Sequence, residues 1–268
     1  MLCYKKYLRG IRYLSKILIL IQFAIVPAVQ AEQISLAVAS NFINPAKALA
    51  QEFETNTGNT IKISSGSTGK LYAQIINGAP FDIFLAADVH RPALLTQSGF
   101  AVPESRFTYA LGRLALWSAN PELIPDDGAT LLKSGTFSRL AIANPKTAPY
   151  GAAAMSILKN LGIINQVQAK LIRGENIGQT YQYIATGNAE LGFTALSQIK
   201  DPANKVVGSE WLVPDQLYTP ISQQAVLLMR AKESPACKSF LAFLKSSSAK
   251  DMLVKKYGYG VSEVLVKK

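Results

Sequence analysis

The sequence holds little of the chemistry on which disulfide-rich folds and metal centres depend. Its 268 residues include two cysteines and one histidine, His90. Cys3 lies in an N-terminal segment that we expect to be removed, so Cys237 is left alone and no intramolecular disulfide can form. Cys237 falls in an apolar helical pattern, which predicts a buried, unreactive thiol. A metal centre is not expected, and the fold must be held by buried apolar side chains.

Long hydrophobic runs are missing beyond the N-terminal segment. Within that segment, five basic residues precede an apolar stretch at positions 17–26, and Val29 and Ala31 stand at −3 and −1 of an expected cleavage site. This pattern is typical of a secretory signal peptide over residues 1–31, cleaved after Ala31. The apolar stretch is too short for a comfortable membrane span, and a retained N-terminal anchor is the alternative. We therefore expect an exported protein.

Acidic residues are also few. The 17 Asp and Glu residues stand against 28 Lys and Arg, which gives a formal net charge of +11. Part of this excess leaves with the signal peptide, and the remaining basic residues are scattered rather than gathered in a stripe with interleaved aromatic residues. The pattern argues against nucleic-acid binding. A moderate positive field favours small anions, but charge alone does not identify a ligand.

What the chain does contain is a repeated alternation of strand and helix patterns. Apolar strands are expected at 34–39, 60–63 and 81–86, with amphipathic helices between them. The same order returns in the second half of the chain, at 140–143, 170–173 and 191–194. Each βαβ series implies a parallel sheet, so we predict an α/β protein of two lobes joined by a hinge, with the ligand in the cleft. The alternative is a single domain built on one long sheet.

The lobe boundaries are expected where this alternation breaks. Extended segments near 106–117 lead the chain into the second lobe, and another at 221–229 leads it back. The last two helical patterns then pack on the first lobe. We accordingly predict that lobe 1 comprises residues 32–111 and 225–268 and that lobe 2 comprises residues 112–224.

The stretch Ser64–Leu71 lies where a strand turns into a helix. It offers small hydroxyl residues, two glycines and the N–H groups of a helix start, which together favour anion binding. It is not a nucleotide P-loop, because Ser64 and Leu71 stand where that motif needs Gly and Ser or Thr. A polar turn with a capping hydroxyl is the competing interpretation. Lys70 is expected to project into solvent.

Other polar turns follow strands in the same way. Ser40-Asn41 ends the first strand, and the turns over 144–151 and 174–178 follow strands of the second lobe. The carboxyl ends of parallel strands are where such sheets bind ligands, so these turns are expected to meet at one site. Asn44 is expected to cap the helix that follows the first of them.

Together these segments resemble the periplasmic molybdate-binding proteins of bacterial molybdate ABC transporters, which are type II periplasmic solute-binding proteins. The resemblance covers nearly the whole chain after the signal peptide. It is carried by residues 37–42, 66–75, 78–88, 144–151, 192–197 and 257–259. It implies a two-lobed periplasmic protein without a cofactor or enzymatic activity. It also implies a monomer that binds molybdate, and also tungstate, through neutral donors and delivers it to an ABC permease in the inner membrane.

Carried over residue by residue, the resemblance implies a site of five positions. Hydroxyl groups would come from two of them and backbone N–H groups from the others: Ser40 and Thr68, then Asn41, Tyr150 and Ile177. Ala195 stands where some members have a tyrosine that reaches the ligand, so the side chain of Tyr150 or Asn41 is expected to take its part. Molybdenum enters only as the oxyanion, without a direct bond to the protein.

These residue types suit a tetrahedral dianion. Such an ion has no proton at neutral pH and only accepts hydrogen bonds, which hydroxyls and helix-start N–H groups donate. Size is expected to separate molybdate from sulfate. Two other functions remain open: binding of sulfate or phosphate, and a secreted serine hydrolase that uses Ser40 or Ser67 with His90 and an Asp. The hydrolase is disfavoured because no G-x-S-x-G elbow is present.

Overall fold

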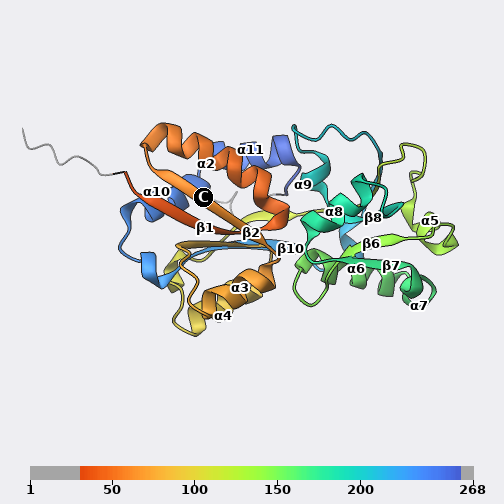
Figure 1. The fold of residues 1–268 in the computed structure, drawn as a ribbon, viewed down its shortest axis with the longest axis horizontal. Coiled ribbons are helices and arrows are strands. Elements are labelled where there is room, and N and C mark those ends of the chain that lie inside the picture. Colours follow the sequence, from red (N-terminus) through yellow and green to blue (C-terminus); the bar gives the residue numbers. More distant parts are fainter. Residues whose placement is uncertain (1–30, 261–268) are drawn as a thin grey trace, which may run out of the picture. The chain divides into compact units, whose positions relative to one another are not determined.

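The computed structural model describes residues 31–260, so residues 1–30 of the expected signal peptide lie outside the described residues. The first sheet has five strands in the order β2-β1-β3-β10-β4 (Figure 1). β1 pairs in parallel with β2 and β3, whereas β10 runs antiparallel to β3 and β4. The strand bounds are β1 (Gln33–Ala39), β2 (Thr60–Gly66), β3 (Ile83–Ala86), β4 (Phe107–Gly112) and β10 (Ile221–Leu227).

Helices cover both faces of this sheet because successive strand residues point to opposite sides. Leu36 and Val38 of β1 pack with the helices of one face, and Ala37 packs with those of the other. The first face holds α2 (Ile43–Thr57), α10 (Pro235–Leu244) and α11 (Ser247–Tyr257); the second holds α3 (Thr68–Ile76) and α4 (His90–Gln97). The last two helices thus return to the first lobe, as the sequence predicts.

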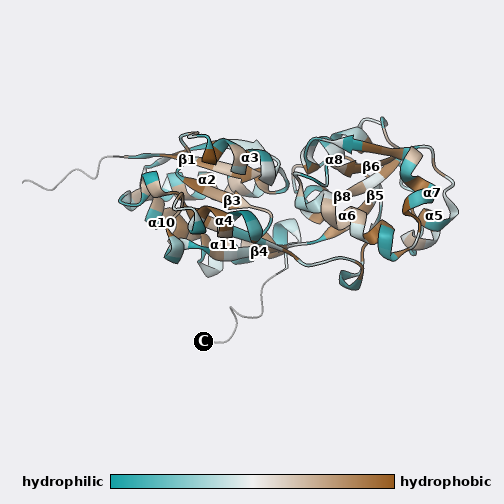
Figure 2. Ribbon diagram, turned by 90° about the horizontal axis from the view of Figure 1, so that it is seen from below, coloured by the Kyte–Doolittle hydropathy of each residue, from teal (hydrophilic) through white to brown (hydrophobic). Residues whose placement is uncertain are grey.

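The second sheet repeats the arrangement in the order β7-β6-β8-β5-β9. β6 is parallel to β7 and β8, and β5 is antiparallel to β8 and β9. Figure 2 shows hydrophobic colour gathered on strands such as β6, whose residues are buried on both faces. The strand bounds are β5 (Leu114–Ser118), β6 (Leu140–Ala143), β7 (Leu171–Gly174), β8 (Leu191–Ala195) and β9 (Ser209–Leu212).

The helices of this lobe divide between its two faces by the same alternation. Leu140 and Ile142 pack with α6, while Ala141 packs with α8. The helix bounds are α5 (Gly128–Ser134), α6 (Pro149–Asn160), α7 (Ile164–Val167), α8 (Ile177–Ala185) and α9 (Leu196–Ile199). Short 3₁₀ turns complete the set: η1 (Ser40–Phe42), η2 (Pro103–Ser105), η3 (Gln168–Lys170), η4 (Asp215–Leu217) and η5 (Met229–Ala231).

The predicted fold class, an α/β protein of two lobes, is confirmed, but each sheet is mixed rather than parallel throughout. The antiparallel members of each sheet come from the strands that cross between the lobes. β4 ends at Gly112 and β5 begins at Leu114, while β10 brings the chain back. The predicted boundary between 224 and 225 falls inside β10, and residues from Glu32 onward form one unit by their contacts, so the exact lobe boundaries stay a prediction.

Two local expectations were wrong. β2 extends to Gly66 rather than ending at Ile63, so the first part of the Ser64–Leu71 stretch is strand. Asn44 does not cap α2, because η1 runs directly into that helix and makes Phe42 the N-cap residue.

Cys237 is buried in α10, and burial raises the pKa of its thiol to about 11. The thiol is therefore protonated near neutral pH, and a thiol in that form is a poor nucleophile. Within residues 31–260, no helix has the length and apolar character needed to cross a membrane.

Candidate functional site

Four helix starts carry the predicted site residues. Thr68 and Ile177 are the first residues of α3 and α8, Tyr150 is the second residue of α6, and Asn41 lies in η1. N–H groups at these positions have no acceptor within their own helix. Three of the four helices are long enough to carry a dipole whose positive end lies at the same N–H groups. Each start therefore presents a donor of favourable polarity.

These starts converge at the contact between the two lobes. Gly178 N–H, next to Ile177, donates to Ser40 Oγ at 3.4 Å, and Gly69 N–H, next to Thr68, donates to Thr147 O at 2.8 Å. Ala39 and Ala87 of the first lobe belong to the same apolar cluster as Tyr150 and Ile177 of the second. All five predicted residues are buried: Ser40, Asn41, Thr68, Tyr150 and Ile177.

The two hydroxyl groups are oriented by bonds that they accept. Thr68 Oγ1 accepts from Ala87 N–H at 3.2 Å, and Ser40 Oγ accepts from Gly178 N–H. A hydroxyl that accepts from the backbone in this way keeps its own hydrogen for another partner. Ser40 and Thr68 each therefore keep a hydrogen that can be donated to another partner.

Which side chain substitutes for the missing tyrosine at Ala195, that of Tyr150 or that of Asn41, stays a prediction. Asn41 Nδ2 donates to Gln223 Oε1 at 2.9 Å and to Tyr259 Oη at 3.0 Å, so its hydrogens are already used. The Tyr150 phenol lies against Gly112 and accepts from Gln223 Nε2 at 3.2 Å, which places it in the crossing strands. For a ligand, Asn41 keeps its backbone N–H, whereas Tyr150 keeps both its backbone N–H and the hydrogen of its hydroxyl, which only accepts from Gln223.

Sequence reasoning missed two hydroxyl groups beside the site. Ser67 is 2% exposed, and its Oγ is buried without a hydrogen-bond partner in the part of the chain that the structure describes. Thr147 Oγ1 is also buried without a hydrogen-bond partner among the described residues. Thr147 belongs to the second lobe and meets Gly69 of the first. A buried hydroxyl without a partner costs free energy, so both are candidate donors. No local pattern distinguishes them from ordinary turn residues.

The charged groups nearest the site are paired with each other. Arg91 pairs with Asp88 at the start of α4, and its guanidinium also donates to Lys146 O across the lobes at 3.2 Å. Lys70 is exposed, as expected, and forms an ion pair with Glu175 across the lobes. The site itself is lined by neutral groups. Burial raises the pKa of the Tyr150 phenol well above its usual value, so this side chain stays neutral as well.

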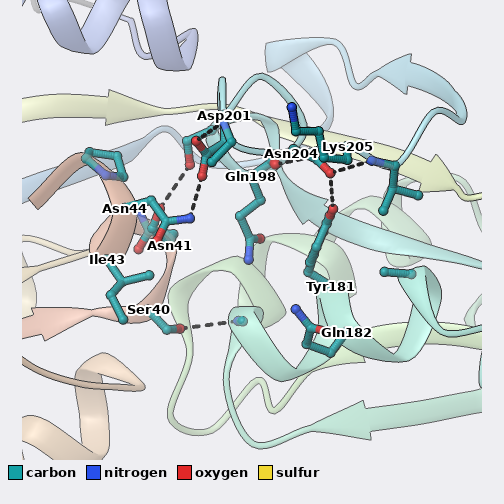
Figure 3. Close-up of a pocket in the computed structure, with 16 residues that line it drawn as sticks. Ser40, Asn41, Ile43, Asn44, Tyr181, Gln182, Gln198, Asp201, Asn204 and Lys205 are labelled. Carbon is teal, nitrogen blue, oxygen red and sulfur yellow. Dashed lines mark hydrogen bonds between the residues drawn. The ribbon is translucent and has the colours of Figure 1, made fainter. Parts of the chain in front are cut away.

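A cavity of about 480 Å³ opens beside the site, between α2 and the helices α8 and α9 (Figure 3). Ser40 and Asn41 lie at one side of this cavity, whereas Thr68, Tyr150 and Ile177 do not line it. Asn44 Nδ2 donates to Asp201 across it, which is the contact that replaces the expected helix cap (Figure 3). The cavity thus adjoins the cluster of donors without enclosing it.

The hydrolase interpretation finds no geometry to support it. His90 is exposed and lines a groove with Arg91 and Pro149. Among residues 31–260, no hydrogen bond joins it to a serine or a carboxylate, and no group of three or more His, Cys, Asp or Glu side chains gathers as a metal site. Ser40 and Ser67 accordingly lack the base that a nucleophile needs.

Two α/β lobes with helix N-termini facing one another across their contact define a two-lobed solute-binding protein. Comparison with known families agrees: residues 34–260 match the family described as bacterial extracellular solute-binding protein. The chain belongs to this family.

Two relatives and one solved structure match most of the chain. It is 49% identical to the molybdate-binding protein ModA of Azotobacter vinelandii over 87% of this chain and 92% of that protein. It is 46% identical to ModA of Rhodobacter capsulatus over 87% and 90%. The solved periplasmic molybdate-binding protein of Azotobacter vinelandii superposes with a TM-score of 0.81 at 40% identity, covering 85% of this chain and 99% of that one. Because these relatives are binding proteins, the chain is a binding protein and not an enzyme.

Proposed function

We infer that the chain captures molybdate at the lobe contact and delivers it to a membrane permease of the ABC type. The observation that carries this proposal is the convergence of buried, neutral donors from four helix starts and two hydroxyls: Asn41, Thr68, Tyr150 and Ile177 through N–H, and Ser40 and Thr68 through O–H. A dianion needs donors on most of its oxygens when it leaves water. The names of the relatives support molybdate as that dianion.

Neutral donors explain how the site binds a dianion reversibly. The N-termini of α3, α6 and α8 each contribute a partial positive charge, which stabilises the anion without a cationic side chain. Tungstate has nearly the same size, charge and shape, so it belongs to the proposal as well. Sulfate is smaller and would leave some donors stretched, which makes size the expected filter.

The expected signal peptide and the family support a cellular location for the protein. We place the mature protein in the periplasm, with cleavage after Ala31, as a monomer that presents both lobes to the permease. The lobe contacts made by Gly69 and Gly178 would hold the two lobes together around the ligand.

Titration of the purified chain from Glu32 onward tests the proposal. Calorimetry with molybdate, tungstate, sulfate and phosphate should give saturable one-to-one binding of the first two, and weaker binding of the others. Saturable binding of phosphate or of an organic solute alone would contradict the assignment. Mass photometry or sedimentation of the same sample tests the monomer.

The Lys70–Glu175 ion pair is expected to contribute little. Both side chains are more than half exposed, at 54% and 56%, so solvent screens their attraction. Glu175→Gln should increase the molybdate dissociation constant by a factor of about five or less, since exposed pairs contribute roughly 0–1 kcal/mol. The change should shrink further in high salt. Glu233→Gln, which removes a pair within the first lobe, is the control.

A further inference from the structure

Gln223 lies at the point where the returning strand passes between the lobes. It is on β10 and fully buried, at 0% exposure. Ile221 at the start of the same strand packs in the core of the second lobe, while Ala225 packs in the core of the first. The side chain of Gln223 is therefore held at the junction of the two cores.

One amide makes three hydrogen bonds at this junction. Its Oε1 accepts from Asn41 Nδ2 at 2.9 Å and from Tyr109 Oη at 3.0 Å, and its Nε2 donates to Tyr150 Oη at 3.2 Å. Only a side chain with an acceptor and a donor on one end can make this set. The amide thus links Asn41 of the first lobe to Tyr150 of the second.

The backbone is shaped to admit these contacts. The pairing of β4 with β10 shifts register between Gln223 and Gln224, which leaves Tyr109 as an extra residue on β4. Such bulges redirect side chains near functional sites. A Cβ atom at Gly112 would collide with Tyr150 Oη and lie 2.8 Å from Gln223 Nε2, so glycine allows the crossing segment to approach.

We propose that Gln223 is a positioning residue that sets the spacing between the two halves of the oxyanion site, and with it the selectivity for the larger oxyanions. The inference rests on the proposed function, since Asn41 and Tyr150 are the residues whose N–H groups would bind the ligand from opposite lobes. Gln223 bonds to the side chains of both residues, and it acts on the ligand only through them. Without this link, the donors are free to close on a smaller ion, so molybdate loses more affinity than sulfate.

The first test replaces the amide with an apolar side chain of similar shape. Gln223→Met should raise the molybdate dissociation constant about tenfold, as expected for lost buried hydrogen bonds, and should lower the ratio of molybdate to sulfate affinity. The matched control is Gln224→Met, because Gln224 is the next residue on the strand. Its Nε2 donates to Thr108 Oγ1 at 3.3 Å, and its Oε1 has no hydrogen-bond partner among residues 31–260. The control should change neither affinity more than about twofold.

The second test adds a charge behind the site. Gln223→Glu retains the shape but places a carboxylate near the dianion, so molybdate affinity should be lowest at pH 8.5 and rise toward pH 6 as the carboxyl takes a proton. The groups that face this position are the phenols of Tyr109, Tyr150 and Tyr259, and Asp88 acts on Tyr109. These groups are common to the parent chain, whose affinity should stay constant over the same range.

Calorimetry with molybdate and sulfate distinguishes the outcomes. If the parent chain binds neither ion, the proposed function fails and this inference with it. If the parent chain binds molybdate and Gln223→Met matches Gln224→Met in affinity ratio, the inference alone is overturned. A Gln223 effect that is equal for both ions, with no pH dependence in Gln223→Glu, also overturns it. Should Gln223→Met not fold, Tyr150→Phe removes only the phenol end of the link; an unchanged affinity ratio there overturns the inference.

Discussion

A Ser40→Ala/Thr68→Ala double variant is expected to bind molybdate between about 10² and 10⁴ times more weakly than the parent chain. Each hydroxyl is buried and accepts from one backbone N–H, which leaves its hydrogen for the ligand. A hydrogen bond to a charged group contributes about 1.5–3 kcal/mol, and the two hydroxyls act from different turns of the first lobe. Titration calorimetry measures the loss.

The control for this variant is Thr55→Ala/Ser156→Ala. Both of these hydroxyls are exposed and bond to carbonyl groups of their own helices, Gln51 O and Ala152 O. Thermal unfolding of the two double variants without ligand reports what the hydroxyls contribute to folding alone. Retention of the parent affinity by Ser40→Ala/Thr68→Ala would remove both residues from the site.

Gly69→Val is expected to lower molybdate affinity by a factor of between about 5 and 150, because excess volume at a packed contact costs about 1–3 kcal/mol. A Cβ atom on Gly69 would lie 3.0 Å from Thr147 Cα and 3.1 Å from Thr147 O, both backbone atoms of the opposite lobe. It would also lie 3.0 Å from Arg91 Nη2 of the first lobe, but that is the far end of a flexible side chain, which can move aside. The added methyl groups therefore hinder closure of the lobes more than the folding of either. Affinity should fall while the melting temperature of the ligand-free protein changes by only a few degrees.

Gly66→Ala is the control for this position, because its new Cβ would meet only Leu71, at an ordinary distance of 3.5 Å. The molybdate affinity of Gly69→Ala should lie between the affinities of Gly69→Val and the parent chain. The rise in melting temperature caused by saturating molybdate should follow the same order, since stabilisation by a ligand depends on its affinity. A Gly69→Val protein that melts early without ligand would instead indicate damage within the first lobe.

Many of the helices and strands could be predicted from the sequence, because they depend on interactions between residues that are close in the chain. The expected strand at 34–39 and the helix that opens at Thr68 depend on side-chain periodicity and on helix-start residues within a few positions. The expectation for Asn44 failed because its amide bonds to Asp201, 157 residues away. The full length of β2 likewise depends on pairing with β1 through Gly66, which local pattern at Ser64–Gly66 does not reveal.

The candidate site also has features that the local sequence indicates and features that depend on contacts between distant residues. The sequence by itself determined which turns follow strands and open helices, because that depends on a short stretch of chain. The family resemblance then assigned Ser40, Asn41, Thr68, Tyr150 and Ile177 to the site, and their role as donors stays a prediction. Only the tertiary structure decided which donors remain free. Asn41 Nδ2 is used by Gln223, 182 residues away, and Asn41 O accepts from Ser197 Oγ, 156 residues away. Hydrogen-bond capacity is local, but its use depends on partners that only the packing of the two lobes brings together.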